Sequence, residues 1–396
     1  MVNLPCYFLK MKKLKLYTTL LIVALISLSA CKNDLDVLAP GEESVSVYCV
    51  LNPNEPEQNV RINKVYITSG DALASAQDAN QINYDTSELR VSLQRFLTGS
   101  TTPTLTTVGN STKKEIVLTG TTVTTASGLF NQQQTIWKTT DKLYNSGEYK
   151  LTILIKATGK VITSQTLMVD SVKSYGSMPF VFYPNANPLI AYPVHCGVGP
   201  AGYVAPTIPG TGTQQGAYID YHVLTATPKI KFKSVPNAKL YNVIMRFHYI
   251  DSLTDNITGI RNYVDYNFTS QTSPTLVGSE PMEVSFNAVD FYTNITNQIP
   301  KKTVGSIKNR TAHYMEYIIY ACNDDMQTFL QVNQPGNTIA QDKPNYSNIN
   351  GGVGVFGAIS KTSLGKELWS DFIDEISNNP ITQSLQFSKT YTFICP

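Results

Sequence analysis

A glycine run near the C-terminus has the spacing of a nucleotide-binding loop. Residues 352–357 read Gly-Val-Gly-Val-Phe-Gly, which fits the pattern GxGxxG. Such a loop needs a helix that begins within the motif and points its N-terminus at a pyrophosphate, and an acid about 20 residues later. Here the run continues into Ala358-Ile359-Ser360, and a helical pattern begins only near Leu364. We therefore predict a strand whose glycines allow close backbone approach or a bulge.

A tight acidic group is the next candidate for chemistry. Asn323-Asp324-Asp325 carries oxygen ligands of the kind that Ca²⁺ prefers. The same residues suit the first turn of a helix, where they cap free N–H groups and favour the helix dipole. We favour capping of a short helix over 324–331.

The cysteines and histidines show no metal-binding spacing. There is no CxxC pair, and the four histidines, His195, His222, His248 and His313, are scattered. We therefore predict no zinc site and no cofactor. Apart from Cys6 and Cys31, four cysteines remain, and they could form up to two disulfides with three connectivities. They are Cys49, Cys196, Cys322 and Cys395. Because three of them lie in strand-like apolar runs, we favour buried thiols over bridges.

No catalytic residue is predicted. The sequence has no GxSxG, HExxH, Walker A or EF-hand pattern. A pair of carboxylates for glycoside hydrolysis would follow no fixed spacing, so a glycan-active enzyme stays open. Exposed tyrosines can stack on sugars or fill a partner's pocket, and Tyr183, Tyr192 and Tyr203 are the candidates.

The N-terminus has the pattern of an export signal. Residues 1–30 hold four lysines and no acid, followed by an apolar run from Leu16 to Ala30 that ends in small residues. This is a basic region, an apolar region and a cleavage site, and the run is shorter than the about 20 residues that span a bilayer. We predict a signal peptide over 1–30, with the natural start at Met1 or Met11.

The residues before Cys31 point to lipid attachment. Leu28-Ser29-Ala30-Cys31 resembles the lipobox of bacterial lipoproteins, which implies that Cys31 is diacylated and becomes the first residue of the mature chain. Residues 31–43 form a polar stretch that favours a flexible tether. A lysine and acids directly after the cysteine resemble the surface-export signal of Bacteroidota lipoproteins, while a plain acidic linker fits equally well.

Composition excludes one class of partner. Without residues 1–30 the chain would lose four of its 31 Lys and Arg and none of its 29 acids, which leaves a net charge of −2. This balance lacks the basic surface of a nucleic-acid-binding protein. With 42% hydrophobic and 15% charged residues, the chain can bury a core of two domains of ordinary size.

Period-two alternation of branched and aromatic residues predicts an all-β fold in two units. The first unit is an N-terminal β-sandwich over 44–170, with strands over 44–51, 60–68, 89–96, 115–118, 134–138, 148–157 and 161–169. A Pro/Gly-rich connection over 171–225 follows. The second unit covers 226–396, with strands over 229–233, 240–249, 263–268, 282–286, 313–322 and 383–394. Apolar residues at helical spacing predict one amphipathic helix over 364–376.

Two resemblances extend this interpretation. Residues 230–241, Ile-Lys-Phe-Lys-Ser-Val-Pro-Asn-Ala-Lys-Leu-Tyr, look like the opening of a fibronectin type III domain. Residues 346–358, Tyr-Ser-Asn-Ile-Asn-Gly-Gly-Val-Gly-Val-Phe-Gly-Ala, resemble the C-terminal signature of a large family of uncharacterised Bacteroidota outer-membrane lipoproteins. This second resemblance implies tandem immunoglobulin/fibronectin-III-like β-sandwich domains, an outer-membrane location and work beside a TonB-dependent transporter.

The leading hypothesis is therefore a lipid-anchored outer-membrane binding or accessory lipoprotein without enzymatic activity. A surface glycan-active enzyme or glycan-binding protein is the second hypothesis, and an adhesive or structural envelope component is the third. The sequence leaves three points open: the ligand contacts, the disulfide state, and whether the lipid sits in the periplasmic or the surface leaflet.

Overall fold

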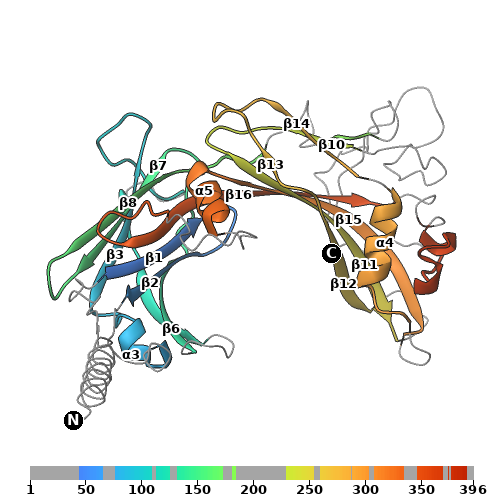
Figure 1. Cartoon of the computed structure of the whole chain (residues 1–396), viewed down its shortest axis with the longest axis horizontal. Coiled ribbons are helices and arrows are strands. Elements are labelled where there is room, and N and C mark those ends of the chain that lie inside the picture. The colour runs from blue at the N-terminus through green and yellow to red at the C-terminus, as the bar shows by residue number, and fades with distance from the viewer. Residues whose placement is uncertain are drawn as a thin grey trace, which may run out of the picture.

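The computed structural model shows a mostly β protein with two lobes joined by a long, curved sheet (Figure 1). The strands form a nine-stranded sheet of mixed direction, a four-stranded antiparallel sheet and a three-stranded antiparallel sheet. Within the described part of the chain, no helix is both long enough and apolar enough to cross a membrane. The structure describes residues 44–65, 76–108, 113–124, 132–172, 181–183, 229–253, 259–286, 288–302, 307–333, 346–368, 373 and 376–389.

The N-lobe packs two sheets around one core. The large sheet contributes β1 (Ser44–Leu51), β2 (Gln58–Val65), β5 (Thr119–Thr124) and β6 (Gln133–Thr139). The smaller sheet runs in the order β4-β3-β7-β8, and its strands are β3 (Leu89–Phe96), β4 (Glu115–Val117), β7 (Glu148–Ile155) and β8 (Val161–Leu167). Alternate residues of β1 and β7 are buried, as expected for strands with one face on a core. The short helix α3 (Ala79–Ile82) lies beside β2.

The C-lobe is built on long antiparallel strands. β11 (Leu240–Ser252) pairs with β12 (Ile260–Asn267), β13 (Gln271–Thr272) and β15 (Asn309–Cys322). The three-stranded sheet consists of β9 (Val181–Tyr183), β10 (Lys229–Lys233) and β14 (Pro281–Ser285). Helix α4 (Ala288–Gln298) places Phe291 against Tyr266 of β12, with ring centroids 5.9 Å apart. These elements bury one face of the long sheet.

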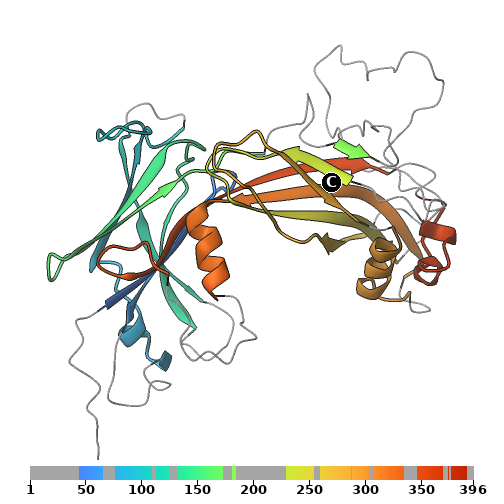
Figure 2. The same cartoon turned by 45° about the horizontal axis from the view of Figure 1, so that its top comes forward.

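One strand belongs to both lobes. In β16 (Val353–Glu367), residues 353–358 pair in parallel with β1, in the register Ser46↔Val353 to Leu51↔Ala358. Residues 359–367 of the same strand pair antiparallel with β15, from Cys322↔Ile359 to Tyr314↔Glu367. A continuous backbone ladder therefore runs from the edge of the C-lobe into the N-lobe, as Figure 2 also shows.

The glycine run makes this pairing sterically feasible. A Cβ atom on Gly354 would lie 2.0 Å from the carbonyl oxygen of Val47, and one on Gly352 would lie 2.6 Å from that of Val45. Gly354 also has a φ of +119°, which L side chains rarely adopt. The prediction of a strand with glycines for close approach is confirmed, and no helix begins within the run.

Two asparagines fix the joint between the lobes. Asn348 Nδ2 donates to the carbonyl oxygen of Phe356 at 2.7 Å, and the Phe356 N–H donates back to Asn348 Oδ1 at 2.9 Å. Asn323 Nδ2 donates to Thr166 Oγ1 at 2.7 Å, which ties the end of β15 to β8 of the N-lobe. Asn348 uses its donor and its acceptor on the backbone of one residue, Phe356, whereas Asn323 donates to β8 and accepts from the N–H groups of Met326 and Ala358.

Helix α5 (Asp324–Asn333) starts at this joint. The Met326 N–H donates to Asn323 Oδ1 at 3.2 Å, and Asp324 and Asp325 occupy the first turn. The predicted capping role of the Asn-Asp-Asp group is therefore confirmed.

A fully buried arginine holds the far end of the C-lobe. Arg310 on β15 forms a two-point ion pair with Asp251 on β11, with N–O distances of 2.7 and 3.0 Å. Its Nη1 also donates to the carbonyl oxygens of Pro300 and Leu385. The loop after α4 and the 3-10 helix η1 (Gln383–Leu385) are thereby fastened to the long sheet.

Two predicted elements near the C-terminus need correction. The helix over 364–376 does not begin at Leu364, because 364–367 continue β16 and pair with β15. Residues 373 and 376–378 are helical, and Leu368, Ile373 and Ile376 are buried as the apolar stripe predicted. The strand over 383–394 is wrong for 383–389, where η1 is followed by Gln386 in the left-handed region. Strand β5 was not predicted, because its Thr-rich sequence carries no apolar alternation.

Cysteines 49 and 322 are buried free thiols, which confirms the preference for thiols over bridges at these two positions. Cys196 and Cys395 lie outside the described residues, as do the predicted signal peptide, the lipidated Cys31 and the tether. The Pro/Gly-rich connection over 171–225 also lies outside them, except for residues 171, 172 and 181–183.

We predict that Gly354→Ala lowers the free energy of unfolding by about 3 kcal/mol or more, because the new Cβ meets a backbone oxygen in a strained φ region. Gly159→Ala is the matched control, since Gly159 also has a positive φ but no atom within 4 Å of the added Cβ. That control should cost about 1 to 2 kcal/mol. Urea denaturation of both variants measures the difference, and equal costs would contradict the close approach.

We also predict that the two buried thiols do not react in the folded protein. Burial raises the pKa of Cys322 to about 12 and the pKa of Cys49 still further. Because the thiolate is the reactive form, N-ethylmaleimide at mildly alkaline pH should leave both unmodified until urea unfolds the chain. Mass spectrometry of the two cysteine peptides reads this out, and rapid modification without urea would refute the burial.

Candidate functional site

Six polar and aromatic side chains gather on one face of the long sheet of the C-lobe. The register places Asp265 of β12 and Glu316 of β15 opposite Arg246 of β11, and Tyr263 and Tyr314 opposite His248. Directly paired residues point to the same side of a sheet. We call these six residues the charged-aromatic face; they are Arg246, His248, Tyr263, Asp265, Tyr314 and Glu316. Their neighbours Met245 and Phe247 are buried in the core on the opposite face.

An arginine and an aspartate form the outer part of this face. Arg246 Nε lies 2.7 Å from Asp265 Oδ1, and Arg246 Nη2 lies 2.9 Å from Oδ2. The guanidinium carbon also lies 4.0 Å from the centre of the Tyr263 ring, which places the charge over one face of the ring. The hydrogen bond to Asp265 raises the pKa of Arg246 above its usual range. The pair thus fixes both the cation and the ring beneath it.

A histidine and a glutamate form the inner part. His248 Nε2 lies 3.0 Å from Glu316 Oε2, and both side chains are mostly buried. This hydrogen bond is the largest cause that lowers the pKa of Glu316, so the carboxylate is the favoured form. A carboxylate can only accept, so Nε2 carries the hydrogen and donates it.

Aromatic stacking continues the inner pair toward the far end of β15. The imidazole of His248 lies parallel to the Tyr314 ring, with centroids 4.0 Å apart and planes 7° apart. Tyr263 lies on β12, the other strand beside β11, and the centroid of its ring is 5.8 Å from that of His248. Burial raises the pKa of Tyr314, with Glu316 as the second cause, so this phenol keeps its proton at neutral pH. Guanidinium, phenol, imidazole and phenol therefore follow one another across three strands.

A β-bulge lies next to these rings. His248 is paired with Tyr314, but the next residue, Tyr249, is paired with Ala312, so His313 is the additional residue. A bulge increases local twist and redirects a side chain, and bulges are frequent beside functional sites. Here the bulge lies beside the stacked His248 and Tyr314.

The arrangement offers groups for non-covalent binding. A carboxyl group that acts as a general acid at neutral pH needs a raised pKa. Within the described residues, every carboxyl pKa that departs clearly from its ordinary value is lowered, at Glu57, Asp85, Glu115, Glu280 and Glu316. Rings with paired donors and acceptors around them instead suit recognition of a ligand that is partly apolar and partly polar.

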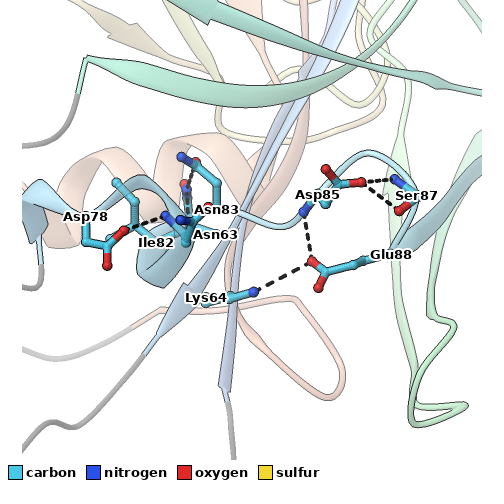
Figure 3. Close-up of polar contacts among 9 residues, drawn as sticks. Asn63, Lys64, Asp78, Ile82, Asn83, Asp85, Ser87 and Glu88 are labelled. Carbon is cyan, nitrogen blue, oxygen red and sulfur yellow. Dashed lines mark hydrogen bonds and ion pairs between the residues drawn. The ribbon is translucent and has the colours of Figure 1, made fainter.

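A second polar cluster, in the N-lobe, has a structural explanation. Figure 3 shows Asn63 of β2 bonded to Asn83, and Lys64 facing Glu88 across 3.6 Å. Asp78 caps α3, since the Asn80 N–H donates to its Oδ1 at 2.9 Å. The Asp85 N–H donates to Glu88 Oε2 at 2.7 Å. These contacts hold α3 and the turn that follows it against β2.

The residues singled out from the sequence have other roles or lie outside the described chain. Asp325, once considered for calcium, accepts a hydrogen bond from Tyr346 at 2.6 Å. Among the described residues, no group of three or more His, Cys, Asp or Glu is placed to hold a metal ion. Tyr192 and Tyr203 lie outside the described residues, and for Tyr183 only the backbone is described, in β9.

The charged-aromatic face was missed by the sequence analysis, although a signal exists. Each of the three strands carries two of its residues at positions i and i+2, as Arg246-x-His248, Tyr263-x-Asp265 and Tyr314-x-Glu316. Positions i and i+2 of a strand share one face. Only the register, however, brings the three pairs together.

Comparisons with known proteins add no family. No protein-family model matches the chain, and no curated protein matches its sequence. The resemblance of residues 346–358 to the Bacteroidota lipoprotein signature therefore stays a prediction.

We predict that Glu316→Gln lowers the free energy of unfolding at neutral pH by about 1 to 3 kcal/mol, because His248 loses a charged acceptor. The folded pKa of Glu316 lies below its ordinary value of 4.5, so its contribution is present above pH 4.5 and is lost as the pH falls through the folded pKa. As the pH falls below 4.5, the free energy of unfolding should therefore decrease less for the variant than for the wild type.

Urea denaturation at a series of pH values measures this difference. Glu55→Gln, which removes a carboxyl group from the exposed β1–β2 turn, is the charge-matched control. Parallel pH profiles for wild type and Glu316→Gln would contradict the assigned hydrogen bond between His248 and the Glu316 carboxylate.

Proposed function

We propose that this chain is a lipid-anchored binding or accessory protein of a bacterial outer membrane, acting with a TonB-dependent transporter or another envelope partner. In this proposal Cys31 carries the lipid, residues 31–43 are the tether, and the folded lobes stand beyond it. Each lobe would be a variant of an immunoglobulin or fibronectin type III sandwich, and the two would share β16.

The order of the elements along the chain is the observation that carries this proposal. β1 starts at Ser44, directly after the predicted tether, and lies inside the N-lobe. An extended tether of 13 residues reaches at most about 45 Å, so the N-lobe would remain near the membrane. The charged-aromatic face lies on the other lobe, which β16 holds to the first (Figure 1). Such a molecule is suited to present a surface that is fixed relative to the N-lobe and kept near the membrane by the tether.

The pairing of the charged groups on the charged-aromatic face supports a binding role over catalysis. Its charged groups already have partners: Arg246 pairs with Asp265, and the Glu316 carboxylate is hydrogen-bonded to His248.

We predict that the tagged protein, purified from mildly solubilised native outer membranes, brings an envelope protein with it in near-stoichiometric amount. Cys31→Ala removes the attachment site of the lipid, so this variant should leave the membrane fraction and lose the partner. Mass spectrometry identifies and quantifies the co-purified proteins.

Two results would overturn the proposal. The first is a Cys31→Ala variant that stays in the membrane fraction with unchanged mass at its N-terminus. The second is a lipidated protein that is recovered alone after chemical cross-linking in intact cells.

A further inference from the structure

Tyr263 is a ring that is both exposed and held in place. Its relative exposure is 55%, which is high for a large aromatic residue. The Arg246 guanidinium covers one face of the ring at 4.0 Å, and that guanidinium is fixed in turn by Asp265. A ring held in this way loses little conformational freedom when a ligand packs on it, which lowers the entropic cost of binding.

Hydrogen-bonding capacity remains around the ring. Arg246 bonds Asp265 through Nε and Nη2, which leaves the donors of Nη1. A carboxylate can accept about four hydrogen bonds, so Asp265 and Glu316 both retain acceptor sites beside their ion pairs. Hydroxyl groups act as donor and acceptor at once, and they match this mixture.

The charges on the face favour a ligand without net charge. Arg246 and Asp265 neutralise each other, and the Glu316 carboxylate is offset by the positive charges of Arg261 near Tyr314 and of Lys361 near Glu316 itself. A strongly charged ligand would have to compete with these ion pairs, whereas a neutral ligand would not.

Addition of a peptide strand at this edge is disfavoured. β12 is the last strand of the large sheet, and side chains already bond two of its carbonyl groups. Gln298 Nε2 donates to the carbonyl oxygen of Asp265 at 2.9 Å, and Asn262 Nδ2 donates to that of Ile260 at 3.2 Å. Strand addition uses such carbonyl groups to bind the incoming backbone.

We propose that the charged-aromatic face binds neutral oligosaccharides, with a sugar ring stacked on Tyr263 and its hydroxyls bonded by Arg246, Asp265 and Glu316. The apolar C–H side of a sugar ring packs on an aromatic face, and its hydroxyl rim meets the polar groups beside that face. The site does not depend on the lipid anchor, so it stands or falls independently of the proposed membrane role.

Isothermal titration calorimetry of the full-length protein in detergent tests this. The probes are cellohexaose, maltohexaose, mannohexaose and xylohexaose, with the anionic hexagalacturonate as the contrast. At least one neutral probe should bind with a dissociation constant of about 1 mM or lower, and more tightly than hexagalacturonate. Tyr263→Ala should weaken this binding by about tenfold or more, because the stacking surface is lost.

Two variants separate stacking from unrelated effects. Tyr263→Phe keeps the ring and should retain the affinity within about twofold. Tyr48→Ala removes a similarly exposed tyrosine, at 45%, from β1 of the N-lobe and should leave binding unchanged. The proposal is wrong if no neutral probe binds, if hexagalacturonate binds most tightly, or if Tyr48→Ala and Tyr263→Ala have equal effects.

Discussion

The pairing of β16 with two different partners is the constraint on which the rest of the structure depends. Its first six residues lie against β1 in parallel and its remaining residues lie against β15 antiparallel, so one backbone belongs to both lobes. Glycines at 352 and 354 are required because carbonyl oxygens of β1 occupy the space that a side chain would need. The asparagines at 323 and 348 then complete the joint by bonding backbone groups and a hydroxyl. Few substitutions at this joint can be neutral.

The candidate site inherits its geometry from the same sheet. The strands that carry Arg246, His248 and Glu316 are β11 and β15. β15 pairs with β16, which continues into the N-lobe. On the opposite face, the buried Arg310–Asp251 pair fastens the end of the same strands. Because removal of either partner would leave the other charge buried and unpaired, this pair specifies how the two strands meet at that end. The charged-aromatic face is thus presented on a sheet that is fixed at both ends, which suits recognition by preformed groups.

Local pattern predicted the elements, while pairing over long sequence distances decided the architecture. The strand over 89–96 was predicted to the residue, because apolar and polar residues alternate from Leu89 to Gln94. The helix predicted from Leu364 was wrong at its start, because pairing with Tyr317 overrides a helical stripe. The glycine run was predicted as a strand, but nothing in its spacing names β1 as its partner. Because the sequence does not show which strands pair, it presents the six residues of the charged-aromatic face only as three unrelated pairs.

Hydrogen exchange of the β16 amides, followed by mass spectrometry of overlapping peptides, tests the central claim most directly. If β16 couples the lobes, amides of 353–358 and 359–367 should exchange through one cooperative opening, with the same protection as their partners in β1 and β15. Rapid exchange of 353–358 together with β1, while 359–367 stay protected with β15, would contradict a shared strand and would describe two lobes that open separately.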